Sequence, residues 1–506
     1  MLSKYSMNRP QFWQKLYRDL LNQHPQQRSR VLNDLAHLSI DDAASDLLRL
    51  TFLSEFFNSD QYIQKAGERI LNSNGLSIDC LSSHVALNCI KALRLGDRKS
   101  FIDSIKNAQL PQIIHKLNDA ALLKIQRAMK PQVSGMLRRV AIVCSYFGNT
   151  FHSPSVLANN YAHTLCSLGI EVNMYSCQEL SPYRMRNYHG AGREVKLPKI
   201  DTASWSQLLP KTCSIVIANE VTTMLARWDA VLQRITQFNP DLILGIGPYS
   251  PLVSALYAVR PTVVLPTNTV SFLGHADVWL KGQDAPTSDD EVSWQGQFAL
   301  PLTYVHPYRI LRPKKHKELS KEQLGLDVKA IALITVGFRL ENEIDGQWAS
   351  KMMDFLSTHP NVVWVLIGSN LPKALNEAPP KSVVNLGPRD DVTEVLSLCD
   401  VYVNPPRMGG GFSVLEAMAL GLPVLAYSNT DGGEKTGPYS IGNHQTYFQN
   451  LAALVTNASA RQKLGSFLQV RFTKYYDMDQ SGPSLLRACH LAVEHARERF
   501  TNAFLL

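Results

Sequence analysis

The sequence predicts an α/β protein in which an all-helical domain precedes two doubly wound parallel sheets that face a cleft. Up to about residue 135, apolar residues recur at three- and four-residue spacing and no convincing β run appears. From Arg138 onward, short runs rich in β-branched residues alternate with amphipathic helices. A second alternation of this kind begins after the lysine-rich stretch RPKKHKELSKEQLGLD. We therefore expect two sheet units in tandem.

The helical domain is expected over residues 1–135. Its helical segments read VLNDLAHL, DDAASDLLRLTFLSEFF, DQYIQKAGERIL, SHVALNCIKALRL and KSFIDSIKNA. The second of these is too apolar for a lone solvated helix, so the segments should pack together.

The first sheet unit is expected over residues 136–315. It opens with RRVAIVCSYFGNTFHSPSVLANNYAHTLCSLGIEVNMYS, which has the pattern strand, loop, helix and strand, with Gly169 where a helix would end in a positive-φ residue. Further strands are predicted at SIVIAN, DLILGIG, TVVLP and DVWL, with the helix MLARWDAVLQRITQF between the first two. A parallel sheet covered by helices should result.

The second sheet unit is expected over residues 316–485, and a C-terminal helix over 486–506. Its predicted strands are IALITVG, VVWVLIGS, SVVNLG, DVYVNP and PVLAYS, and its helices lie around DGQWASKMMDFLS, DDVTEVLSLC and GFSVLEAMALG. Residues 310–325 form the candidate hinge. In such sheets, ligands bind beyond the carboxyl ends of the strands.

Composition excludes several classes of protein. The chain has 506 residues, of which 45% are apolar and 19% charged, and no apolar run approaches the ~20 residues of a membrane span. The start has no apolar leader segment, and the eight cysteines form no CxxC pair, so we expect a cytoplasmic protein without disulfides or a metal site. The net charge of +8 resides entirely in residues 1–139, without the dense basic and aromatic pattern of a nucleic-acid groove.

The strongest motif is DVYVNPPRMGGGFSVLEAMALGLPVLAYSNTDGG, residues 400–433. A buried strand runs through two prolines into Gly409, Gly410 and Gly411, and a helix follows at once. A helix start offers unsatisfied amides and a partial positive charge, which suits a diphosphate. A purely structural alternative is a capping box between Ser413 and Glu416, which would not require three glycines.

The run GGGFSVLEAMALGLPVLA resembles the nucleotide-sugar signature of GT-B glycosyltransferases, especially the retaining GT4 type. The resemblance covers about residues 138–480. It implies that the glycine loop holds the donor diphosphate, that Glu416 holds the ribose, that Arg339 in TVGFRLENEI contacts the phosphates, and that Gly387 and Arg389 in NLGPRDDV lie near the base. The full set of donor-binding residues expected on this basis is Arg339, Gly387, Arg389, Gly409, Gly410, Gly411, Phe412, Ser413 and Glu416.

One position departs from the family pattern. Met408 stands where the family has a second Glu, which contacts the donor sugar. A thioether cannot hydrogen-bond a sugar hydroxyl strongly, so the donor sugar and the stereochemical outcome stay open.

Candidates for proton transfer come from two loops of the first sheet unit. LPTNTVSFLGHADVWL supplies Asn268, His275 and Asp277, and SYFGNTFHSPS supplies His152. A histidine beside a carboxylate is a usual general base at neutral pH, so the pair of His275 and Asp277 ranks slightly above His152. No Asp-x-Asp motif suggests a metal, and the GT-B resemblance implies metal independence.

The sequence thus predicts a glycosyltransferase that moves a sugar from a nucleotide diphosphate sugar to a protein or glycan acceptor, without a cofactor. The layout is similar to that of some bacterial cytoplasmic protein N-glucosyltransferases. Two alternatives stay open, a non-catalytic GT-B subunit that binds a partner and a sugar-nucleotide epimerase or hydrolase. We expect no nucleic-acid partner and no membrane span, and peripheral contact with a membrane stays open.

Overall fold

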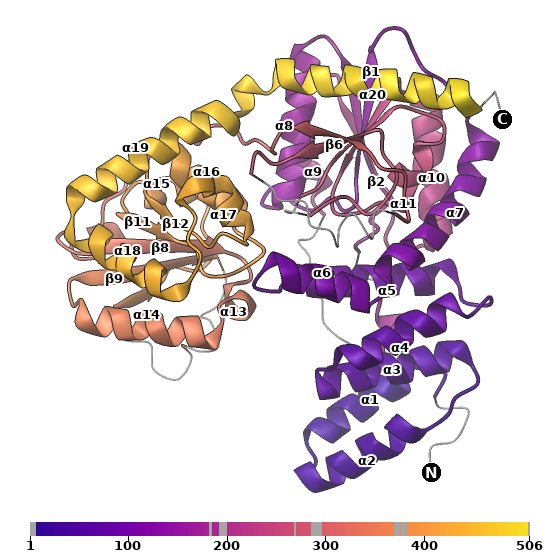
Figure 1. Cartoon of the computed structure of the whole chain (residues 1–506), viewed down its shortest axis with the longest axis horizontal. Coiled ribbons are helices and arrows are strands. Elements are labelled where there is room, and N and C mark those ends of the chain that lie inside the picture. Colours follow the sequence, from indigo (N-terminus) through magenta and orange to yellow (C-terminus); the bar gives the residue numbers. More distant parts are fainter. Residues whose placement is uncertain are drawn as a thin grey trace.

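The chain folds into a helical domain and two α/β sheet domains, as the sequence predicts (Figure 1). The computed structural model describes residues 7–181, 185–191, 200–267, 270–284, 296–368, 375 and 382–503. Within these residues, no helix is long and apolar enough to cross a membrane.

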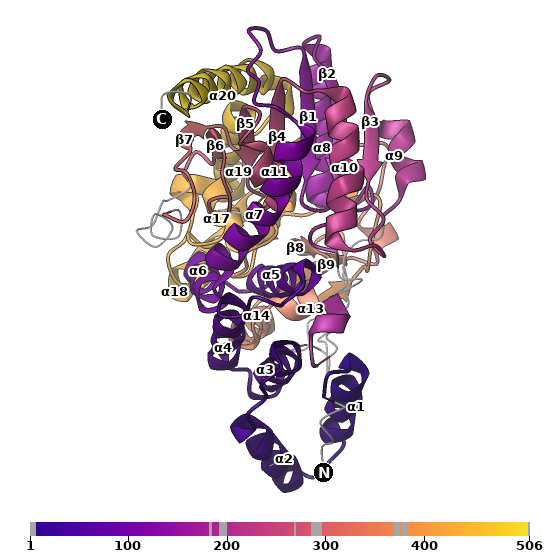
Figure 2. The same cartoon turned by 90° about the vertical axis from the view of Figure 1, so that its right-hand side faces the viewer.

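The helical domain is a stack of helices that meets the first sheet domain along α7 (Figure 2). Its helices are α1 (Pro10–Leu21), α2 (Pro25–His37), α3 (Ala43–Phe57), α4 (Asp60–Leu71), α5 (Ile78–Ala92), α6 (Arg98–Asn107) and α7 (Leu110–Ala128). Asp42 caps α3 by accepting a hydrogen bond from the Ser45 amide at 2.8 Å, and Asp97 caps α6 in the same way through Ser100 at 2.9 Å.

The first sheet is parallel and seven-stranded, in the order β3-β2-β1-β4-β5-β6-β7. Its strands are β1 (Arg139–Cys144), β2 (Glu171–Ser176), β3 (Ser214–Ile217), β4 (Leu242–Ile246), β5 (Thr262–Leu265), β6 (Val278–Lys281) and β7 (Leu302–Val305). Its helices are α8 (Ser153–Ser167), α9 (Thr202–Leu208), α10 (Met224–Phe238) and α11 (Pro251–Leu256). The edge strand β7 was not predicted, because its mostly exposed side chains lack the apolar pattern of the other strands.

The second sheet is parallel and five-stranded, in the order β10-β9-β8-β11-β12. Its strands are β8 (Ile331–Gly337), β9 (Val362–Gly368), β10 (Val383–Asn385), β11 (Val401–Val403) and β12 (Val424–Leu425). The helices are α13 (Leu340–Glu343), α14 (Gly346–Thr358), α15 (Val392–Leu396), α16 (Gly411–Ala419), α17 (Asp431–Thr436), α18 (His444–Thr456) and α19 (Ala458–Tyr475).

The chain crosses between the two sheet domains twice. Ile310 pairs with the segment after α19, donating to Tyr476 O and accepting from the Met478 amide. The last helix, α20 (Gly482–Ala503), then packs against β5 and β6 of the first sheet (Figure 1). The C-terminal helix therefore belongs structurally to the first sheet domain.

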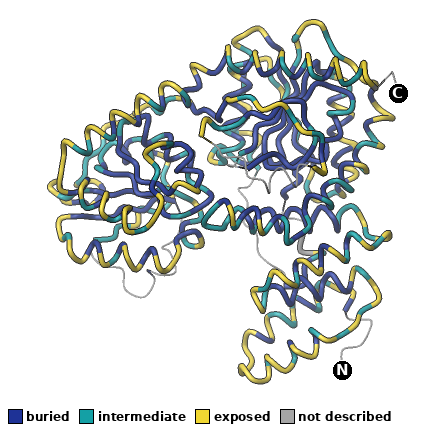
Figure 3. The backbone as a smooth tube through the Cα atoms, in the orientation of Figure 1, coloured by how far each residue is buried: buried dark blue, intermediate teal, exposed yellow. Residues whose placement is uncertain are grey.

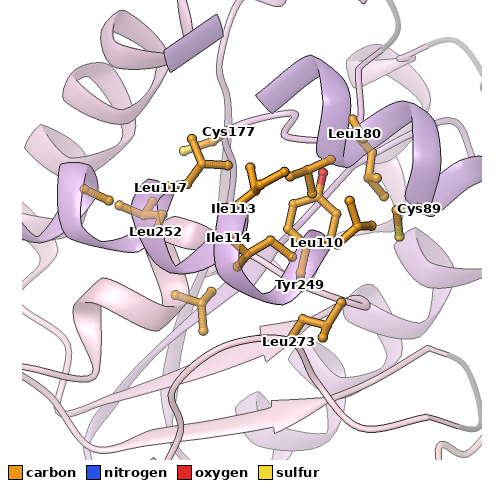
Figure 4. Packing of buried hydrophobic residues seen from close by; sticks show 14 of the residues in the cluster. Cys89, Leu110, Ile113, Ile114, Leu117, Cys177, Leu180, Tyr249, Leu252 and Leu273 are labelled. Atoms are coloured by element: carbon orange, nitrogen blue, oxygen red, sulfur yellow. The ribbon is translucent and has the colours of Figure 1, made fainter. Parts of the chain in front are cut away.

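Side chains along the strands of the first sheet alternate between two apolar cores. Figure 3 shows the strands inside both sheet domains mostly in dark blue, the colour of buried residues. In β1, Ala141 and Val143 face the apolar cluster that includes the helical domain, whereas Val140 and Ile142 face the cluster that includes α8 and α20. Figure 4 shows the first cluster, in which Ile113, Ile114 and Leu117 of α7 pack close to residues of the sheet domain such as Tyr249 and Leu252. The helical domain and the first sheet domain thus share one core.

Candidate active site

The candidate site lies where β8 and β11 end, at the carboxyl edge of the second sheet. β8 leads into Arg339, and β11 leads through Pro405 and Pro406 into the glycine loop that starts α16. A Cβ atom placed on Gly409 would lie 2.9 Å from Arg339 Nη2. The structure therefore brings Arg339 and the glycine loop together.

The three glycines make room for side chains of the protein itself. Gly410 has φ +86°, and a Cβ there would collide with the guanidinium of Arg407. A Cβ on Gly411 would collide with the Asp431 carboxylate and the Tyr308 hydroxyl. Close approaches within the chain account for these glycines, so the three glycines do not by themselves require a bound ligand.

The start of α16 is partly occupied. The Gly411 amide donates to Asp431 Oδ2 at 3.0 Å. The next two amides, those of Phe412 and Ser413, have no hydrogen-bond partner within the described part of the chain. Phe412 itself is half-buried against the core of the domain. Part of the helix terminus thus has amides without a partner among the described residues.

The predicted capping box does not form. Gly410 is the N-cap of α16, so Ser413 lies within the first turn and its hydroxyl donates to Gly410 O at 3.0 Å. The same hydroxyl is 2.7 Å from the Tyr402 hydroxyl. Glu416 therefore takes no part in capping α16.

Glu416 is half-buried and has no hydrogen-bond or ion-pair partner among the described residues. Burial raises its pKa to about 7. A carboxyl group kept from water without a partner is costly unless a ligand supplies donors. Hydroxyl groups of a bound molecule would do so.

Two arginines share one buried carboxylate beside the loop. Glu343 lies 2.7 Å from Arg339 Nη2 and 3.2 Å from Arg407 Nη1, and these two cations hold the pKa of Glu343 below its usual range. Arg407 is 1% exposed and also donates to Val336 O and Asn404 Oδ1, whereas the side chain of Arg339 is 41% exposed. The cluster keeps a net positive charge, and Arg339 is its accessible member.

A second charged cluster contacts the glycine loop at Gly411 through Asp431. Lys435 is buried and lies 2.9 Å from Glu434 Oε1 and 3.4 Å from Asp431 Oδ1, and its ammonium group sits 4.0 Å from the centre of the Tyr308 ring. These neighbours raise the pKa of Lys435 well above its ordinary value despite burial. Sequence reasoning missed Arg407 and this cluster. The signal for the cluster was the polar run TDGGEK.

Of the residues predicted for proton transfer, His152 is placed near the site. Its ring Nδ1 is 2.6 Å from Ser155 Oγ, at the start of α8. Burial and the nearby charge of Arg339 lower the pKa of His152 to about 4.

The pair of His275 and Asp277 does not form, which corrects the sequence prediction. Asp277 is fully buried and accepts hydrogen bonds from the Thr262 amide, His495 and Arg499, which fasten α20 to the sheet. His275 accepts from the Ala299 amide at 2.8 Å and stacks on Tyr257. Both side chains are committed to the fold, and Asn268 lies outside the described residues.

The predicted base-binding loop is held by its own contacts. Gly387 has φ +65°, and its carbonyl accepts from the Gly368 amide. Arg389 forms a two-bond ion pair with Asp391 at 2.6 and 2.7 Å. The guanidinium of Arg389 is therefore engaged within the domain.

The second sheet domain resembles a known protein family. Residues 331–457 match the family model described as glycosyl transferases group 1. A search of the curated proteins found no match. Among solved structures, an O-GlcNAc transferase variant of Thermobaculum terrenum is 13% identical with a TM-score of 0.50, covering 99% of this chain and 100% of the other.

Two further structures match the chain less completely. Alr3699/HepE of Anabaena in complex with UDP-glucose is 14% identical with a TM-score of 0.48, covering 69% of this chain and 98% of its own. WaaG, a glycosyltransferase of lipopolysaccharide biosynthesis, is 13% identical with a TM-score of 0.41, covering 68% and 98%. Given the family match and the architecture, residues 331–457 form a group 1 glycosyltransferase domain, and the chain is a glycosyltransferase of the GT-B fold.

Proposed function

We propose that the chain transfers a sugar from a nucleotide diphosphate sugar to a protein or glycan acceptor, without a metal ion. The observation that carries the proposal is the combination of two unpaired amides at the start of α16, the accessible cation Arg339 and the unpartnered carboxyl of Glu416. The oxygens of a diphosphate would accept hydrogen bonds from the two amides and from the guanidinium of Arg339, and ribose hydroxyls would donate to the carboxyl of Glu416.

His152 is the candidate general base of the proposal. Its low pKa keeps the imidazole neutral at pH 7, so it can accept a proton. Binding of a diphosphate at Arg339 would offset the positive charge that lowers this pKa, and would thereby strengthen the base.

The first test is a binding screen of UDP, GDP, ADP and their glucose and N-acetylglucosamine esters, with and without EDTA. A ligand at ~100 times its dissociation constant should add about 2.7 kcal/mol to stability. The same stabilisation in EDTA supports metal independence. If none of these compounds raises the melting temperature, the proposed donor site is wrong.

The second test separates transfer from other reactions of sugar nucleotides. Release of nucleotide only when a protein or glycan acceptor is present supports a transferase. Release without any acceptor, or conversion of the sugar without release, supports a hydrolase or an epimerase instead. We propose a cytoplasmic location as well, since all eight cysteines are free.

A further inference from the structure

The helical domain reaches the donor loop through the turn between α5 and α6. The Met408 amide, directly before the glycines, donates to Leu95 O at 3.1 Å. The first amide of α6, that of Arg98, donates to Asn429 O, also at 3.1 Å. Figure 1 shows α6 lying between the two sheet domains.

These two hydrogen bonds act on both segments that build the start of α16. Met408 precedes Gly409, and Asn429 lies two residues before Asp431, whose carboxylate binds the Gly411 amide. A shift of either segment would move the amides of Phe412 and Ser413. The helical domain thus contacts the segments on either side of the site.

The Met408 side chain adds an apolar anchor to this contact. It is 4% exposed and belongs to the core shared by the helical domain and the first sheet domain, away from the core of its own sheet. A glutamate here would place a carboxylate among apolar side chains. The residue that departs from the family pattern is therefore the one that joins the glycine loop to the helical domain.

We propose that the α5–α6 turn and Met408 are positioning elements of the donor site: the helical domain holds the glycine loop in the shape that binds the diphosphate. The inference rests on the proposed function, and it gives the helical domain a role in donor binding in addition to any role toward the acceptor.

The main test compares Met408→Ala with Met408→Leu. The measurement is the affinity, by calorimetry, for whichever of UDP, GDP and ADP binds the unchanged protein most tightly. We expect Met408→Ala to bind the nucleotide at least tenfold more weakly than the unchanged protein. Met408→Leu should bind it within threefold of the unchanged protein, because leucine fills the same apolar position. Met352→Ala is the matched control, because Met352 is a fully buried methionine in the core of the second sheet, remote from this contact. It should lower the melting temperature and leave affinity unchanged.

A second pair of variants tests the turn without touching the glycosyltransferase domain. Asp97→Ala removes the cap of α6, and Asp42→Ala removes an equivalent cap of α3 in the same domain. We expect Asp97→Ala alone to weaken nucleotide binding, about threefold or more, and to speed hydrogen exchange of the hydrogen-bonded amides of Met408 and Gly411.

The outcomes separate the two claims. If no diphosphate binds the unchanged protein, the proposed function fails, while hydrogen exchange still decides the positioning claim. If a diphosphate binds and Met408→Ala and Asp97→Ala bind it as tightly as their controls do, the helical domain has no part in donor binding.

Discussion

Two carboxyl groups at the strand edges of this molecule show how differently a polar residue can be used. Asp277, between β5 and β6, is fully buried and satisfied by a backbone amide, a histidine and an arginine. Glu416 lies in the second turn of α16, and its half-buried carboxyl has no partner among the described residues. A saturated carboxylate fixes the fold, whereas an unpaired one at a ligand-facing edge is available for binding.

Removing the saturated carboxylate should have the largest effect. Asp277→Ala leaves His495 and Arg499 without their buried counter-charge, so we expect a loss of about 3–5 kcal/mol of stability. Chemical denaturation measures this loss. The nucleotide affinity of the protein that remains folded should not change. A loss of affinity in that folded protein would show that Asp277 has a role in nucleotide binding.

Arg339→Ala should weaken nucleotide diphosphate binding by about 1.5–3 kcal/mol, the usual value of a hydrogen bond to a charged group. Stability should change little, since Glu343 keeps its ion pair with Arg407. Isothermal calorimetry gives the affinity. An unchanged dissociation constant would show that Arg339 serves only as a partner of Glu343.

Glu416→Gln should alter how stability depends on pH. The pKa of Glu416 is about 7 in the folded protein and near 4.5 when unfolded, so the folded state binds more protons between these values. The free energy of unfolding therefore falls as pH rises through this window. In Glu416→Gln, the contribution of this carboxyl to that decrease should be absent. Glu179→Gln is the control: burial raises the pKa of Glu179 to about 7 as well, but this carboxyl lies in the first sheet domain, where it accepts hydrogen bonds from Trp228 and the Leu252 amide.

The two variants should differ in binding. Only Glu416→Gln should weaken nucleotide affinity, because only Glu416 faces the proposed ribose position. Thermal unfolding between pH 4 and 8 and one calorimetric titration of each variant decide the comparison. Equal affinities would make Glu416 a second buried carboxyl without a binding role.

Ser413→Ala should have the smallest effect. Because Ser413 does not cap α16, its loss should cost about 0.5–1.5 kcal/mol, the value of one hydrogen bond. In a Tyr402→Phe background the cost should shrink, because the partner hydroxyl is already absent. A cost of equal size in both backgrounds would mean that the bond to Gly410 O carries the stability.

The sequence predicted the architecture because strand and helix periodicity is local. It also placed Arg339 and the glycine loop on one edge, since both follow strands of a single parallel sheet. It could not predict the role of Asp277, whose partners His495 and Arg499 come 218 and 222 residues later. Nor could it show that the glycines accommodate Arg407 and Asp431, because that depends on packing between distant segments.

The return of α20 to the first sheet has a consequence for biosynthesis. Strands β5 and β6 leave the ribosome long before the residues that neutralise Asp277 are made. Until α20 emerges, the part of the sheet face over β5 and β6 stays uncovered and carries an unpaired acid, so the first sheet domain can mature only after the glycosyltransferase domain has been translated.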